Sequence, residues 1–135
     1  MQRRTVLLVD DEPEWCELIT CVLGEAGRQV AVASDVPTLK RLLPKYKVDI
    51  ALVDLGLPEG GALPACQTIK GHMGRHLPLI LCWVSHWEVV ADAKAKGWSA
   101  DDWLIMPFTV EDVVERVERL SSARKLRRRR TTRRC

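Results

Sequence analysis

Residues 48–61 read VDIALVDLGLPEGG, an apolar run of strand length that ends in Asp54 and passes into a Gly- and Pro-containing loop. A carboxylate without a partner is costly inside a packed sheet. Asp54 therefore either lies beyond the core, at the end of its strand, or has been placed there for chemistry.

Segments of strand and helix character alternate along the whole chain. The strand-like runs are TVLLV (5–9), QVAVA (29–33), DIALV (49–53), LPLILCWV (77–84) and DWLIM (102–106). Apolar residues recur at helical spacing between them, and Thr109 is the expected cap of the last helix. Strands that are apolar throughout indicate a parallel sheet covered by helices on both faces, and right-handed crossovers leave mainly doubly wound topologies. We therefore predict an α/β protein with a doubly wound, five-stranded parallel sheet.

The composition is that of a single globular domain. The chain has 135 residues, 47% of them hydrophobic and 29% charged, and contains no apolar run of membrane-spanning length. Its first apolar run, TVLLV, is too short for a signal peptide, so a cytoplasmic location is expected. The five cysteines are scattered without a CxxC pair, which favours free thiols over a disulfide framework or a zinc site.

The charge of the chain is divided between two parts. Residues 1–120 hold 13 Lys and Arg and all 18 Asp and Glu, a net charge of −5, whereas residues 121–135 hold eight Lys and Arg and no acid. We predict a domain over 1–120 and a basic C-terminal extension or linker over 121–135. Residues 124–134 could bind nucleic acid weakly and without sequence readout, or could form a solvated extension of the last helix.

Three carboxylates follow two strands of the predicted sheet. Asp10 and Asp11 come after the first strand and Asp54 after the third. If these strands are neighbours, the three side chains converge at one edge, where oxygen ligands suit Mg²⁺ and Asp54 could accept a phosphoryl group. The alternative is that Asp11 caps a helix and Asp54 caps a turn.

Three motifs carry a resemblance to a known family. The segments are VLLVDDEP, VDLGLPEGGAL and DDWLIMPFT, and residues 4 to about 120 resemble a receiver domain of the bacterial two-component response regulators. The resemblance implies a flavodoxin-like (βα)5 fold with strand order 2-1-3-4-5. It also implies that Asp10, Asp11, Asp54 and the backbone carbonyl of Gly56 hold Mg²⁺.

The same resemblance implies a function and partners. Asp54 would take a phosphoryl group from a histidine kinase or a phosphotransfer protein, and the face from the fourth strand (77–84) to the last helix would signal to a downstream protein. Its chemistry would be limited to phosphorylation and dephosphorylation of its own Asp54, so the protein is not expected to be an enzyme acting on other substrates.

The switch positions depart from the family pattern. Met106 stands where the family usually has Lys, and Trp83 stands where it usually has Thr or Ser. In the family, the Thr or Ser side chain moves toward the phosphate and so makes room for the aromatic residue on the fifth strand, here Trp103. An indole is too large to make that small movement. Ser85 would partly substitute for the missing hydroxyl if strand 4 carried a bulge.

These departures leave a second interpretation open. A degenerate pseudo-receiver would act as a phosphorylation-independent protein-binding module. An apolar patch near strands 4 and 5 would serve such binding, unless its indoles fill the core. The members of this patch are Trp83, Trp87, Trp98 and Trp103.

Overall fold

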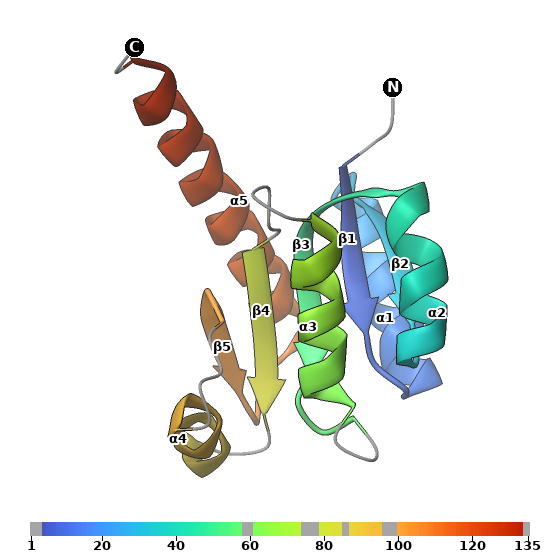
Figure 1. The fold of residues 1–135 in the computed structure, drawn as a ribbon. Coiled ribbons are helices and arrows are strands. Elements are labelled where there is room, and N and C mark those ends of the chain that lie inside the picture. The colour runs from blue at the N-terminus through green and yellow to red at the C-terminus, as the bar shows by residue number, and fades with distance from the viewer. Residues whose placement is uncertain (1–3, 58–60, 74–78, 85–86, 96–99, 134–135) are drawn as a thin grey trace.

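The structure is a computed structural model that describes residues 4–57, 61–73, 79–84, 87–95 and 100–133. Strands and helices alternate from one end to the other (Figure 1). The elements are β1 (Arg4–Val9), α1 (Pro13–Glu25), β2 (Gln29–Ala33), α2 (Val36–Leu42), the 3-10 helix η1 (Leu43–Lys45), β3 (Lys47–Asp54), α3 (Ala62–Met73), β4 (Leu79–Val84), α4 (Trp87–Ala95), β5 (Asp102–Ile105) and α5 (Val110–Arg133).

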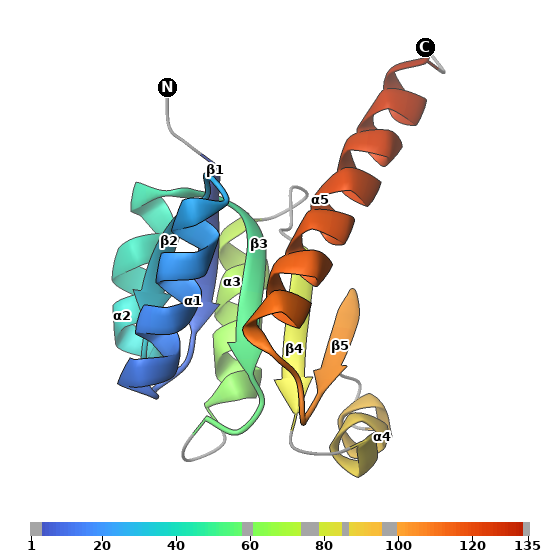
Figure 2. The ribbon, with the colours of Figure 1, turned by 180° about the vertical axis from the view of Figure 1, so that it is seen from behind.

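The five strands form one parallel sheet in the order β2-β1-β3-β4-β5. Helices α2 and α3 cover one face of it (Figure 1), and α1 and α5 cover the other (Figure 2). The predicted α/β fold, doubly wound and flavodoxin-like, is confirmed. Because β1 and β3 are neighbours, the residues that follow them meet at one edge of the sheet.

The central strands are apolar throughout because both of their faces are buried. Successive side chains of a strand point to opposite faces, and in β3 Ala51 and Val53 pack under α2 and α3, while Ile50 and Leu52 pack under α1 and α5. All four are fully buried. This two-sided burial fixes the register of β3 and therefore the position of Asp54 at its end.

Helix α5 begins with a reciprocal cap. The Asp112 N–H donates to Thr109 Oγ1 over 3.1 Å, and the Thr109 N–H donates to Asp112 Oδ2 over 2.8 Å. Val113 and Val117 are fully buried, as the apolar spacing predicts. The helix then continues to Arg133, past the predicted boundary at residue 120 and away from the sheet (Figures 1 and 2).

The division of the chain at residue 120 stays a prediction. Strand β5 ends at Ile105, one residue earlier than predicted, because Pro107 restricts the backbone of Met106 and offers no N–H for pairing. Within the described residues, no helix is both long and apolar enough to cross a membrane.

The end of α1 offers a paired test of backbone conformation. Gly27 has a φ of 84°, a backbone conformation that residues with a side chain rarely adopt. Gly24 lies inside the helix, and a Cβ added there would meet nothing within 4 Å. Gly27→Ala should lower the free energy of unfolding by about 1–2 kcal/mol. Gly24→Ala should raise it by up to about 1 kcal/mol. Urea unfolding of both variants checks the opposite signs, and equal effects would contradict the assigned end of the helix.

Candidate functional site

Three carboxylates meet at the carboxyl edge of the sheet. Asp10 directly follows β1, and Asp54 is the last residue of β3. Carboxylate oxygens of Asp10, Asp11 and Asp54 lie within 4.8 Å of one another. The sequence placed these side chains at two neighbouring strand ends, and the structure brings all three together.

Backbone donors hold two of these carboxylates in place. The Glu12 N–H donates to Asp10 Oδ1 over 3.1 Å, and the Gly56 N–H donates to Asp54 Oδ1 over 2.8 Å. A Cβ at position 56 would lie 3.2 Å from Asp54 Oδ1, so glycine lets the loop fold closely over this carboxylate. The turn is closed by the Leu57 N–H, which donates to the carbonyl of Asp54 over 3.3 Å.

Burial makes the ionised forms of Asp10 and Asp54 unfavourable. Asp10 is only 3% exposed. Burial and the charge of Asp54 together raise its pKa to about 6, although the hydrogen bond from the Glu12 N–H lowers it. Burial also raises the pKa of Asp54, in opposition to its hydrogen bonds with Gly56 and Asp10. Crowded, poorly solvated carboxylates gain most from a cation beside them. The donor set of hard oxygens fits Mg²⁺.

An open pocket of about 290 Å³ lies beside the carboxylates. Its described lining consists of Asp10, Glu12, Trp15, Asp54, Met106 and Phe108. Trp15 and Phe108 meet edge to face with ring centroids 5.7 Å apart, so one wall of the pocket is aromatic. Met106 is 56% exposed, and no Lys, Arg or His is among the lining side chains that the structure describes.

The sequence did not assign Trp15, Glu12 or Phe108 to the pocket. Helical spacing between the first two strands indicates only that Trp15 belongs to the apolar face of a helix. A signal was present, because Trp15 lies in the first turn of the helix that begins two residues after Asp11.

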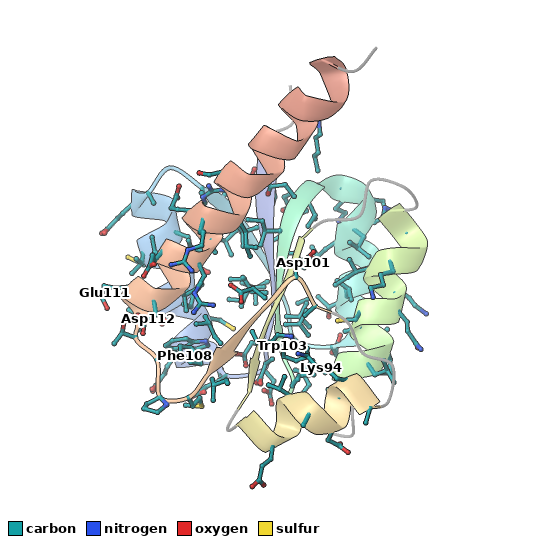
Figure 3. All side chains as sticks on the ribbon, turned by 90° about the vertical axis from the view of Figure 1, so that its left-hand side faces the viewer. Lys94, Asp101, Trp103, Phe108, Glu111 and Asp112 are labelled. Atoms are coloured by element: carbon teal, nitrogen blue, oxygen red, sulfur yellow. The ribbon has the colours of Figure 1, made fainter. Side chains whose placement is uncertain are left out.

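The other predicted switch positions are described only in part. The backbone of Trp83 in β4 pairs in register with that of Asp54, but its side chain lies outside the described ones, and Ser85 lies outside the described residues. Trp103 is half-buried and packs against the apolar cluster under α3. Figure 3 shows Trp103 and Phe108 on opposite sides of β5, in agreement with the two apolar clusters that they join.

The predicted tryptophan patch stays a prediction. Trp98 lies outside the described residues, and the side chains of Trp83 and Trp87 are not described. Trp103, whose side chain is described, contacts the core, which is the alternative role considered for these indoles.

Comparisons with known proteins converge on one family. The family model described as "Response regulator receiver domain" matches residues 6–118. The DNA-binding response regulator MtrA of Mycolicibacterium smegmatis is 28% identical over 115 residues, which are 85% of this chain and 49% of that protein. The transcriptional regulatory protein GltR of Pseudomonas aeruginosa is 31% identical over 119 residues, 87% of this chain and 48% of that protein. The chain thus spans about half the length of these relatives.

Solved structures share the fold. The signal receiver domain of a response regulator from Bermanella marisrubri superposes with a TM-score of 0.75 at 23% identity, covering 89% of this chain and 99% of that one. The chemotaxis response regulator CheY4 of Vibrio cholerae has a TM-score of 0.70 at 23% identity, covering 87% of this chain and 98% of that one.

Proposed function

This chain belongs to the response regulator receiver domain family, and we propose that it is the phosphoacceptor of a two-component phosphorelay, with Asp54 as the residue that takes the phosphoryl group. The observation that carries the proposal is the meeting of three carboxylates at the edge of an open pocket, with their oxygens within 4.8 Å of one another. Buried acids with raised pKa values beside a pocket are typical of functional sites.

The residues divide the work as follows. Asp10, Asp11, Asp54 and the carbonyl of Gly56 would hold Mg²⁺, which supplies positive charge against the carboxylates and the phosphoryl oxygens. The hydrogen bond from the Gly56 N–H to Asp54 Oδ1 fixes the orientation of the carboxylate that accepts the phosphoryl group. An oxygen of Asp54 attacks the phosphorus of a phosphohistidine, and the P–N bond breaks with its electron pair returning to the imidazole. Water attack on the same phosphorus later releases inorganic phosphate and restores the carboxylate.

The proposal includes partners and a place of action. The donor is a histidine kinase or a phosphotransfer protein in the cytoplasm, and the face from β4 to α5 passes the signal to a downstream protein. A nucleic-acid contact through residues 124–134 would be independent of Asp54, because residues 124–133 lie at the far end of α5.

Metal dependence of phosphorylation tests this function. Incubation with a small-molecule phosphodonor and Mg²⁺ should add one phosphoryl group, read by intact mass, whereas a chelator should prevent the adduct. The charge of Mg²⁺ is needed because the acyl phosphate carries about two negative charges where the carboxylate of Asp54 carried one, in a pocket that is already acidic. Mg²⁺ binding without any adduct would favour the phosphorylation-independent module, for which the uncharged Met106 in the pocket is the supporting observation.

A further inference from the structure

We propose that residues 124–133 of α5 form a phosphate-binding helix whose partner is double-stranded nucleic acid, held through its backbone without sequence readout. The proposal goes beyond the phosphoacceptor function and does not need Asp54. It starts from the charge balance along α5, which changes abruptly after Arg119.

Three acids on or beside the part of α5 that packs on the sheet are paired with arginines. Arg116 Nη1 lies 2.7 Å from Asp102 Oδ2, and Arg119 pairs with Glu115 one turn earlier. Glu118 is already engaged by Arg28 of the loop after α1, at 3.0 Å. Each of these acids therefore has its cation within the body, and none lies within four residues of the basic run.

The part of α5 beyond the body has no such balance. Eight of the eleven residues from 124 to 134 are Lys or Arg, and no Asp or Glu occurs after Glu118. Since the helix runs to Arg133, seven pairs of these cations stand three or four residues apart, such as Arg124 and Arg128. Like charges at this spacing destabilise a helix, and the favourable helix dipole reaches only the last turn. An external polyanion would remove this repulsion along the whole segment.

The helix also separates the basic segment from the acidic body. Residues 1–120 carry a net charge of −5, which by itself would repel a nucleic acid. Residues 121–133 span about 20 Å as a helix, and Figure 1 shows this part of α5 projecting past the sheet. The Debye length at physiological salt is about 8 Å, so the far turns of α5 are screened from the body.

The composition of the segment favours a nucleic acid over a membrane surface. Leu126 is its single apolar residue, so the segment has no apolar residues that recur at helical spacing. A helix that lies on a membrane needs an apolar face to bury. A duplex instead offers a dense row of phosphates, and arginine binds phosphate in a bidentate manner. With no aromatic residue in the segment, base stacking is absent and binding should be indifferent to sequence.

Duplex binding by charge variants of the full chain tests the proposal. The probes are two labelled DNA duplexes of unrelated sequence and vesicles of phosphatidylserine and phosphatidylcholine. Replacing Arg127, Arg128, Arg129 and Arg130 together by Gln should weaken binding to both duplexes by about 100-fold at low salt. The slope of log affinity against log salt should become shallower by about 3 to 4, since each phosphate contact contributes about 0.9.

Two matched controls keep the test specific. The same four residues changed to Lys should leave the salt slope nearly unchanged, because the charge is kept, and should weaken binding far less than the Gln changes, because only the bidentate geometry of arginine is lost. Changing the exposed body residues Lys45 and Lys47 to Gln should have no effect. Circular dichroism should show helix content rising when the duplex is added to the wild type and not to the Gln variant.

Three results would overturn the proposal. They are a Gln variant that binds as tightly as the wild type, a body variant that loses binding to the same degree, and vesicles that bind more tightly than either duplex at the same salt concentration.

Discussion

Asp10→Asn is expected to make the metal-free protein more stable while abolishing its binding of Mg²⁺. Asp10 is 3% exposed and its pKa is raised from 3.8 to about 6, first by burial and then by the charge of Asp54. At pH 7.5 the folded protein must keep this carboxylate ionised, which costs up to about 3 kcal/mol. Asn keeps an oxygen for the Glu12 N–H and carries no charge, so the free energy of unfolding should rise by about 1–3 kcal/mol.

The pH dependence of this gain follows from the direction of the pKa shift. Because the folded pKa of Asp10 is raised, the stability that its protonated form contributes is fully present below pH 3.8 and is lost as pH rises through about 6. The stability gap between Asp10→Asn and wild type should therefore be largest at pH 7.5 and should shrink at pH 5.

Urea unfolding in a chelator at these two pH values measures the gap. Asp92→Asn, which removes an exposed carboxylate of α4, should leave stability nearly unchanged. Adding Mg²⁺ at pH 7.5 should stabilise the wild type and not Asp10→Asn. A gap of the same size at both pH values, or an Asn variant that is less stable than the wild type at pH 7.5, would contradict the unfavourable ionisation assigned to Asp10.

Met106→Lys is expected to increase phosphorylation of the protein by about 10- to 100-fold. Met106 lines the same pocket as Asp54 and is 56% exposed, so a longer cationic side chain has room to reach the phosphoryl oxygens. A hydrogen bond to a charged group contributes about 1.5–3 kcal/mol. The uncharged Met106 supplies none of this.

The initial rate of adduct formation with a small-molecule donor and Mg²⁺ measures the effect. Met106→Leu is the matched control, because it keeps an apolar side chain of similar size, and it should behave like the wild type. If Lys and Leu at this position gave equal rates, the missing cation would not explain any weakness of this receiver.

The sequence could predict the sheet because its signal is physical and local. Both faces of β1 and β3 are buried, so their residues read as continuous apolar runs, and strand ends could be located from Asp10 and Asp54. The convergence of the acids then followed from the neighbouring positions of the two strands. The roles proposed for these acids and for Gly56 remain predictions.

The pocket walls could not be predicted in the same way. Helical spacing groups Trp15, Leu18 and Ile19 as apolar, but Ile19 is fully buried, Leu18 is 46% exposed and Trp15 lines the pocket. Which of three apolar residues meets the sheet, the solvent or the site depends on how α1 sits on the sheet, and spacing does not contain that information. The sequence also could not predict whether α5 continues past residue 120, because arginine favours helix formation while neighbouring like charges oppose it.

The most direct test of the central claim compares Asp54→Asn with the wild type for adduct formation. Both proteins would be incubated with Mg²⁺ and a small-molecule phosphodonor, with Asp92→Asn as the control for loss of a carboxylate elsewhere, and intact mass would be recorded. We predict one phosphoryl group on the wild type and on Asp92→Asn and none on Asp54→Asn. An adduct that persists in Asp54→Asn would contradict the assignment of Asp54 as the phosphoacceptor.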